Sequence, residues 1–313
     1  MSTSPPPKVT IITPAYNRAG YLEETIKSIL QQGYPNLEYI VLDDGSTDNT
    51  VEILKQYEGR IRWESHANMG ETLTVNKGFQ MASGEYFCVV NSDDLLLPGA
   101  IQQAVDMLKA HPDVLVVYPD WTYIDEKSSP THVVHVPEHD YRYMVGQHKC
   151  YVGPAAFFRR NAIALTGGRN PGFRYVADFD FWLRLGLHGE FKRIPQVLGT
   201  FRVHSGSASV RQKASIAKED IRLIQSYYQT TNLPPEILRI KRQAFSSAHL
   251  HAAFTCEPDH LAALRHYLRF LLYDPANLLR ADLSPLRWWY LRQPLARFKR
   301  WLTSPQAGKE VQK

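Results

Sequence analysis

The sequence contains few cysteines. Cys88, Cys150 and Cys256 are the only three in 313 residues, they are widely spaced, and they form no CxxC pair. This pattern excludes a disulfide scaffold and a zinc site built from cysteines, and it is typical of proteins in a reducing compartment. We therefore expect a cytoplasmic protein.

Long apolar runs are also missing. No run approaches the roughly 20 residues that a membrane-spanning helix needs. The first residues, MSTSPPPK, have no apolar core and do not resemble a secretory signal, so residues 1–8 are expected to be a flexible leader. We expect a soluble protein or one that lies at a membrane surface, such as the inner face of the cell membrane.

A strong charge of one sign is absent. Lysine and arginine number 36 against 31 acidic residues, and the net charge of +5 is dispersed. This excess does not indicate nucleic-acid binding, and no nucleic-acid partner is expected. An apolar fraction of 44% is globular composition, and the length suits one large domain or two modest ones.

Apolar strands alternate with amphipathic helices in the first third of the chain. Strands are expected at Val9–Thr13, Leu37–Leu42, Arg60–Ser65, Tyr86–Val90 and Val114–Tyr118. Helices are expected between them, at Tyr21–Gln32, Thr47–Tyr57, Glu71–Ala82 and Gly99–Ala110. This order predicts βαβ units and a mostly parallel sheet.

The rest of the chain has two parts. Residues 120–210 show a mixed and irregular pattern. The chain then becomes helical, with helices expected at Ser215–Tyr228, Glu236–Phe254, Asp259–Tyr273 and Leu286–Leu302.

Polar clusters follow three of the predicted strands, at Pro14–Asn17, Asp43–Asp48 and Asn91–Asp94. In open α/β sheets, ligands bind beyond the carboxyl ends of the strands. The carboxylates of Asp43–Asp48 could accept hydrogen bonds from a base or a ribose, or could simply cap the following turn. Those of Asn91–Asp94 suit Mg²⁺ or Mn²⁺ shared with phosphates, or a turn before a helix.

Two further groups come later in the chain. Asp178 and Asp180 open a helix, where a carboxylate can serve as a cap or as a catalytic base. His204 follows a short predicted strand; a lone histidine is usually structural, but its place after the Asp178 helix makes it a candidate.

Together these motifs resemble family 2 glycosyltransferases of the GT-A fold, over about residues 9–209. The resemblance rests on PAYN at Pro14–Asn17, DDGSTD at Asp43–Asp48, NMG and NKG within Asn68–Gly78, ASGEY at Ala82–Tyr86, NSDDLLLPG at Asn91–Gly99, AAFFRR at Ala155–Arg160, ADFDFWLRL at Ala177–Leu185 and FRVHSGSAS at Phe201–Ser209. It implies a Rossmann-like, mostly parallel sheet flanked by helices. Residues 9–112 would bind the nucleotide sugar, 113–210 would bind the acceptor, and 211–313 would form a helical C-terminal extension.

The resemblance also implies roles on the donor side. Pro14, Tyr16 and Asp44 would hold the base and ribose of a nucleoside-diphosphate sugar, and Asp43 would support the turn. Lys77 is a candidate contact to the diphosphate, because the arginine that many relatives carry nearby is replaced by Val75.

The metal and the catalytic base follow in the same way. Asn91, Ser92 and Asp93 would form the DxD element that binds the diphosphate and Mn²⁺ or Mg²⁺. The metal ligands would come from Asp93, Asp94 and His204, without a choice between the two aspartates. Asp178 would be the general base. Asn91 replaces the first aspartate of the DxD element, and Ala177 replaces the glutamate that many relatives carry before the base.

The implied reaction is an inverting sugar transfer onto a hydroxyl of a glycan or lipid-linked glycan, as in polysaccharide synthesis. Two other functions stay open: a nucleotidyltransferase, and a non-catalytic module that binds sugar nucleotides or carbohydrate. The first would call for a basic glycine-rich loop after the first strand, where PAYNRAG offers only Arg18 and Gly20.

Aromatic residues and the basic tail bear on the acceptor. Rings that could stack on sugars, or pack in the core, are Trp121, Tyr123, Tyr141, Tyr143, Tyr151 and Phe173. Residues 286–302 are amphipathic and basic, which predicts either peripheral contact with an anionic membrane or a terminal helix docked on the protein.

Overall fold

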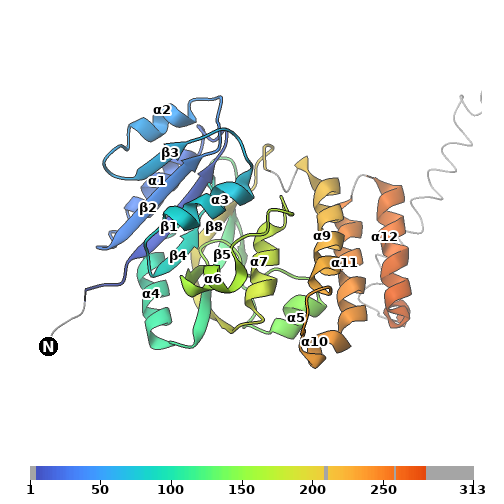
Figure 1. Cartoon of the computed structure of the whole chain (residues 1–313). Helices are drawn as coiled ribbons and strands as arrows, with labels where there is room; N and C mark the ends of the chain where they lie inside the picture. Colours follow the sequence, from blue (N-terminus) through green and yellow to red (C-terminus); the bar gives the residue numbers. More distant parts are fainter. Residues whose placement is uncertain (1–4, 208–210, 257–258, 280–313) are drawn as a thin grey trace, which may run out of the picture. The chain divides into compact units, whose positions relative to one another are not determined.

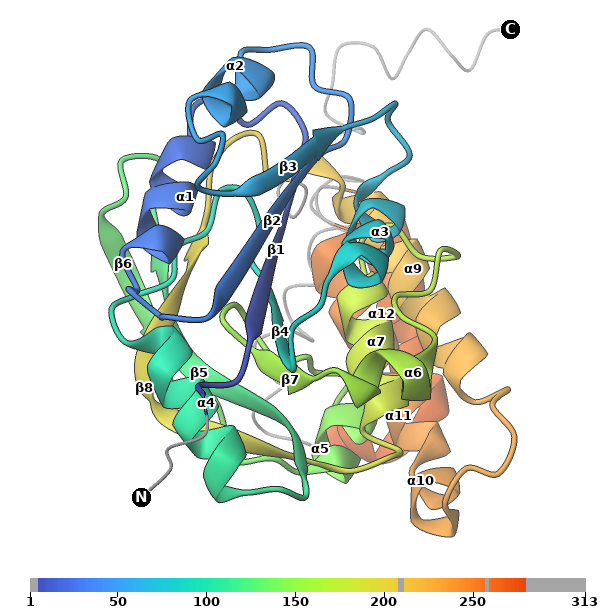
Figure 2. The same cartoon turned by 60° about the vertical axis from the view of Figure 1, so that its left-hand side comes forward.

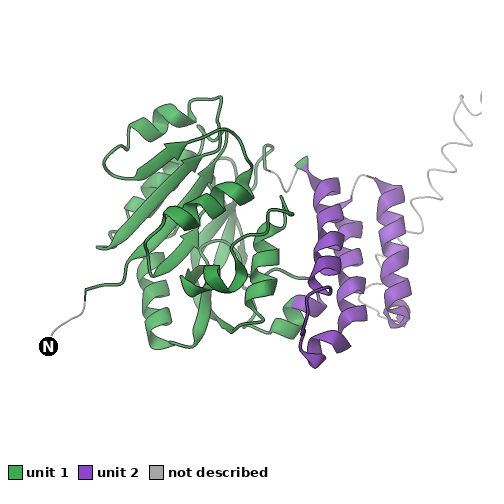
Figure 3. Ribbon diagram, viewed as in Figure 1, with its two compact units in different colours: residues 1–144, 149–211 green, residues 145–148, 212–313 purple. Residues whose placement is uncertain are grey.

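The computed structural model describes residues 5–207, 211–256 and 259–279. They fall into two compact units (Figure 3). One comprises residues 1–144 and 149–211, and the other comprises residues 145–148 and 212–313. The first contains the sheet and the second is helical. The amphipathic segment 286–302 lies outside the described residues.

The sheet has eight strands in the order β3-β2-β1-β4-β7-β5-β6, and β8 pairs with β5. Their bounds are β1 Val9–Ala15, β2 Leu37–Asp43, β3 Arg62–Ser65, β4 Tyr86–Val89, β5 Val114–Ile124, β6 Pro130–Val134, β7 Phe157–Arg159 and β8 Glu190–Arg202. The pairs β1·β2, β1·β4, β2·β3 and β5·β8 are parallel, whereas β7 is antiparallel to both β4 and β5. The mostly parallel sheet expected from the sequence is therefore confirmed.

Helices cover both faces of this sheet (Figure 1). Figure 2 shows α1 and α4 on one side, and α3, α6 and α7 on the other. The helices of this unit are α1 Leu22–Leu30, α2 Thr50–Lys55, α3 Glu71–Met81, α4 Ala100–Ala110, α6 Asn161–Thr166 and α7 Ala177–Leu185, while α5 Tyr141–Gly146 ends in the second unit.

Strand β1 shows why the sheet is covered on both faces. All seven of its residues are buried. Because successive side chains point to opposite faces, Ile11 joins the core formed with Ile26 of α1 and Ile101 of α4. Ile12 points the other way, toward Gly78 of α3. A Cβ added to Gly78 would lie 2.7 Å from Cγ2 of Ile12. A strand with two covered faces reads as a continuous apolar run, as VTIIT does.

The region that looked irregular in the sequence is ordered. It holds β6, β7 and the 13-residue strand β8, so the strand before His204 is long rather than short. Only part of β8 is buried, and Pro195 and register shifts against β5 interrupt the alternation that would have marked it as a strand.

The helical unit consists of α9 Lys213–Tyr227, α10 Pro235–Arg239, α11 Lys241–Thr255, α12 His260–Tyr273 and the 3₁₀ helix η1 Pro275–Leu279. Its core is rich in alanine, with Ala217, Ala252 and Ala263 fully buried, so the helix backbones can approach closely. The single helix expected at Glu236–Phe254 is two helices, separated at Ile240. No helix within the described residues is long and apolar enough to cross a membrane.

Gly84, which precedes β4, provides a test of the sheet packing. A Cβ there would lie 2.3 Å from Thr10 Oγ1 and 2.7 Å from Thr10 N. We expect Gly84→Ala to lower the free energy of unfolding by about 1–3 kcal/mol because β1 and β4 would be forced apart. Urea denaturation measures this. Gly20→Ala is the control, since nothing lies within 4 Å of its Cβ position; equal stability of the two variants would contradict the packing argument.

Candidate active site

One edge of the sheet collects the carboxyl ends of six strands. Since β7 is antiparallel to both β4 and β5, these two strands run in the same direction, which is also that of β1, β2, β3 and β8. The polar clusters Pro14–Asn17, Asp43–Asp48 and Asn91–Asp94 therefore lie at the same edge, which is the usual place for a ligand.

The Asp43–Asp44 pair organises the loops at this edge. Asp43 is fully buried and accepts hydrogen bonds from Ser65 Oγ at 2.6 Å and Ser46 N at 3.2 Å. The two oxygens of Asp44 accept the backbone N–H groups of Met69 and Gly70, at 2.7 and 3.0 Å. Both carboxylates thus hold turns, and their predicted nucleotide contacts stay predictions.

Gly45 makes this turn sterically feasible. Its φ is +76°, and a Cβ there would lie 2.8 Å from Asn68 N. A side chain would therefore clash with backbone as well as strain the residue, because the left-handed region favours glycine.

Pro14, Tyr16 and Lys77, the other residues predicted to contact the nucleotide sugar, differ in their exposure and in their partners. Pro14 is buried in β1, and Tyr16 directly after β1 is 46% exposed, so its ring is open to a planar base. Lys77 forms an ion pair with Glu64 and does not line the cavity described below. Its contact to a diphosphate stays a prediction.

Asp93 meets an arginine and a histidine from distant parts of the chain. His204 Nε2 lies 3.0 Å and Arg18 Nε 3.3 Å from Asp93 Oδ2. The His204 ring also contacts Tyr21, with centroids 4.8 Å apart. The structure thus brings together Asp93 and His204, which are separated by more than a hundred residues.

Asp94 points elsewhere. Its carboxylate accepts the N–H of Arg202 at 2.8 Å and the side-chain amide of Asn91 at 3.2 Å. Burial, and then the neighbouring Asp93, raise the pKa of Asp94 well above its ordinary value. Ser92, which precedes Asp93 in the chain, is also buried. Asp94 therefore serves the turn, and Asp93 presents the carboxylate that His204 meets.

Arg202, at the end of β8, is the largest fully buried side chain described. Its Nε donates to the carbonyl of Asp93 at 2.7 Å, and its Nη1 donates to Asp125 O at 3.1 Å and Ser128 Oγ at 2.8 Å. Its Nη2 pairs with Glu24 at 2.7 Å. One guanidinium therefore fixes the Asp93–Asp94 turn against α1, β8 and the loop after β5.

The chemistry of this donor set fits a divalent cation. Asp93 supplies a hard oxygen and His204 a nitrogen, and the Arg18 guanidinium already provides positive charge beside the same carboxylate oxygen. Mn²⁺ and Mg²⁺ usually take only one or two carboxylates and complete their shell with water and phosphate oxygens.

A cavity of about 320 Å³ opens beside this turn. Its lining includes Asn91, Asp94 and Asp178, together with Glu71, Phe79, Val89, Trp121, Tyr123, Cys150, Val152, Gly153, Pro154, Ala156, Phe158, Arg169, Phe181, Trp182 and Phe201. Asn91 and Asp178, which lie 87 residues apart in sequence, therefore line one space.

Aromatic packing holds Asp178 at this cavity. Phe181 and Trp182 of α7 pack edge-on against Phe158 of β7, with ring centroids 5.4 and 5.8 Å apart. The first turn of α7 is thereby fixed, and Asp178 Oδ1 accepts the N–H of Phe179 at 2.7 Å.

Several residues of the candidate site, some of them in the cavity lining, were not predicted as site residues. Arg169 and Glu71 form an ion pair at 2.9 Å in the lining, and Arg202 appeared in the sequence only as a neighbour of His204. No local pattern marks an ion pair between residues so far apart. Of the predicted sugar-stacking rings, Trp121 and Tyr123 line the cavity, whereas Tyr151 and Phe173 are buried.

The comparisons with known proteins decide the family. A model described as "Glycosyl transferase family 2" matches residues 10–166, about half of the chain. The chain belongs to this family. It is 28% identical over 244 residues to chondroitin synthase from Escherichia coli, covering 77% of this chain and 34% of that protein. It is 30% identical over 218 residues to an uncharacterized glycosyltransferase from Rickettsia typhi, covering 65% and 66%. The chain thus spans less than two thirds of these family 2 relatives.

Solved structures share the fold. The match to S. aureus TarS residues 1–349 in complex with UDP-GlcNAc has a TM-score of 0.66 at 15% identity, covering 86% of this chain and 82% of that one. The match to the mannosyltransferase PcManGT from Pyrobaculum calidifontis, in complex with GDP-Man and Mn²⁺, has a TM-score of 0.61 at 21% identity, covering 92% and 84%. The GT-A fold expected from the sequence is confirmed.

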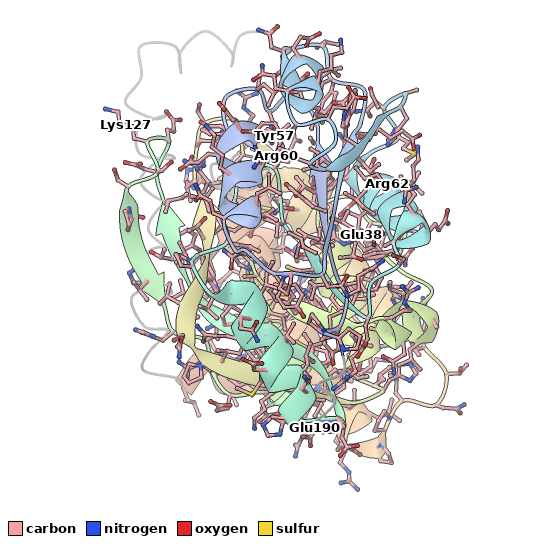
Figure 4. All side chains as sticks on the ribbon, turned by 90° about the vertical axis from the view of Figure 1, so that its left-hand side faces the viewer. Glu38, Tyr57, Arg60, Arg62, Lys127 and Glu190 are labelled. Carbon is pink, nitrogen blue, oxygen red and sulfur yellow. The ribbon has the colours of Figure 1, made fainter. Side chains whose placement is uncertain are left out.

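The role of Arg202 can be tested by Arg202→Lys. Lysine keeps the charge, but its single nitrogen cannot reach the partners that Arg202 holds with three separate nitrogens, so buried carbonyls lose their partner. We expect unfolding free energy to fall by on the order of 3 kcal/mol in chemical denaturation. The control is Arg62→Lys on β3, an exposed arginine (Figure 4). A loss no greater than that of the control would refute the role of Arg202.

Proposed function

We propose that this protein transfers a sugar, with inversion, from a nucleoside-diphosphate sugar to a hydroxyl of a glycan or lipid-linked glycan. The product would serve the synthesis of a surface polysaccharide or glycoconjugate. Membership of glycosyltransferase family 2 supports the reaction class. The names of relatives, such as chondroitin synthase and hyaluronan synthase, favour a glycan acceptor.

One observation carries the proposal. Asp178 lines the same cavity as Asn91 and Asp94, next to the turn where Asp93 meets His204. A leaving diphosphate at that turn and a base in the opposing helix would leave room between them for one sugar ring. The cavity volume of about 320 Å³ is in the range of small-molecule sites.

The residues would divide the chemistry as follows. The acceptor hydroxyl attacks the anomeric carbon on the face opposite the diphosphate, through an oxocarbenium-like transition state. Asp178 takes the hydroxyl proton on Oδ2, while Oδ1 stays fixed by the Phe179 N–H. Holding the base rigidly lets positioning contribute as well as basicity.

The leaving diphosphate would lie at the Asp93 turn. Asp93 and His204 would hold Mn²⁺ or Mg²⁺, which when bound supplies positive charge against the charge that builds up on the diphosphate. Arg18 would add a fixed cation at the same place. Tyr16 and Asp44 would bind the base and ribose, with Pro14 and Asp43 supporting their loops.

Trp121 and Tyr123 are the best placed of the aromatic residues to contact a sugar. Their rings pack edge-on, with centroids 4.7 Å apart, and both line the cavity. The buried Nε1 of Trp121 meets no acceptor within the described residues, so a sugar hydroxyl could accept its hydrogen. Peripheral membrane contact through residues 286–302, and a cytoplasmic location, stay predictions.

Donor turnover distinguishes this function from a non-catalytic sugar-nucleotide or carbohydrate-binding module on the same fold. The protein is incubated with UDP-, GDP- and dTDP-sugars and Mn²⁺, and release of nucleoside diphosphate is followed. We expect one donor to be consumed, with EDTA abolishing release and Mn²⁺ or Mg²⁺ restoring it. A donor that raises the melting temperature but is never consumed would favour the module, and release unaffected by EDTA would contradict the metal.

Asp178→Asn tests the base. Since the amide cannot take up the proton, we expect kcat for transfer to fall by at least about 100-fold, with donor binding little changed. The matched control is Asp106→Asn, an exposed aspartate on α4 whose side chain accepts a hydrogen bond from Gln102. If Asp178→Asn turned over as fast as this control, another residue would have to be the base.

A further inference from the structure

Outside the candidate active site, the helical unit contains a cluster of three side chains that are common metal ligands. His148 follows α5, Asp220 lies in α9 and His251 lies in α11, and all three belong to this unit. One ligand atom from each residue lies within 4.8 Å of the other two. The Asp93, Asp94 and His204 set is not grouped so closely.

The carboxylate of Asp220 contacts both imidazoles, one through each of its oxygens. His148 Nε2 lies 3.1 Å from Asp220 Oδ1, and His251 Nδ1 lies 2.8 Å from Asp220 Oδ2. A tetrahedral zinc ion with bonds of about 2.0–2.2 Å separates its ligand atoms by roughly 3.3 Å. Small shifts of the two rings would therefore admit an ion between them.

Burial suits a bound ion with one open position. The side chains of His148 and Asp220 are 1% and 3% exposed, whereas that of His251 is 52% exposed. A buried carboxylate needs hydrogen-bond partners or a cation, and at present the two imidazoles occupy both of its oxygens. The exposed side at His251 gives an ion and a water ligand access from solvent.

The backbone at His148 is a second, independent sign. Its φ is +47°, in the left-handed region that non-glycine residues rarely adopt. Such a conformation costs free energy and persists where the surroundings require it, often at ligand clamps. Here it directs the ring onto a carboxylate 72 residues away in the sequence.

We propose that His148, Asp220 and His251 bind one Zn²⁺ ion, with water as the fourth ligand, and that this ion ties segment 145–148 to α9 and α11. Two imidazole nitrogens and one carboxylate are donors that zinc prefers over magnesium. Binding needs the ring nitrogens that now face the carboxylate to be free of protons, so each such proton either moves to the other nitrogen of its ring or, from a protonated ring, leaves to solvent. The site is structural and separate from the proposed catalytic cation, so it does not depend on the proposed function.

The experiment is a Zn²⁺ titration of the full, metal-free chain by calorimetry, in excess Mg²⁺ to saturate oxygen-rich sites. We expect one equivalent of Zn²⁺ to bind and to raise the melting temperature. His251→Gln removes a half-exposed ligand, so the fold should survive, and Zn²⁺ should bind more than roughly tenfold more weakly. Asp93→Asn should keep the zinc.

The matched control is His266→Gln in α12. His266 Nδ1 lies 2.9 Å from His249 Nδ1, which makes it a paired histidine of the same unit outside the cluster. We expect it to bind Zn²⁺ as the unchanged chain does. Loss of Zn²⁺ binding in His266→Gln but not in His251→Gln would place the metal at the His249–His266 pair and overturn the proposal.

A measurement on the unchanged chain makes the test independent of any variant. Co²⁺ in place of Zn²⁺ should give the strong visible absorption of a four-coordinate site, and X-ray absorption of the zinc form should show two imidazole ligands. No binding in excess Mg²⁺, or a shell of oxygens only, would mean that the cluster is simply a buried ion pair.

Discussion

The buried guanidinium of Arg202 is the constraint on which the candidate active site depends. It is anchored to Glu24 in α1 and to the loop after β5, and it donates to the carbonyl of Asp93. A charge so deep in the protein is tolerated because each of the three side-chain nitrogens has a fixed partner. With the backbone of the turn held in this way, the Asp93 side chain lies against His204 and Arg18. The arrangement of the turn is thus set before any ligand binds.

Much of the fold could be predicted from the sequence because its signals are local. The runs VTIIT and LEYIVL are buried on both faces, and each is followed by an amphipathic helix, so strand and helix were both recognisable. Of strand β8 only a short stretch before His204 was recognised, since Pro195 and the register shifts against β5 break the alternation of the rest. The division of the helix near Ile240 has no proline or glycine to mark it.

The candidate site was predictable in part for the same reason. Asp93, Asp178 and His204 each follow a strand or begin a helix, where short motifs carry a recognisable pattern. The roles of Arg202 and of the Arg169–Glu71 pair come only from contacts across 74 residues or more, which no local spacing reveals. Lys77 was predicted from its place in a motif, but the sequence did not reveal that Glu64 of β3 would be its ion-pair partner.

Segment 145–148 has a consequence for how the polypeptide can be divided. Its chain neighbours on both sides belong to the sheet unit, yet Val145 and His148 are buried within the helical one. The polypeptide therefore crosses between the units three times rather than once. A chain cut after residue 211 would lose the helices that pack against residues 145–148, although these four residues lie in the middle of the sequence of the sheet unit. Proteolysis or gene truncation therefore cannot remove the helical unit cleanly.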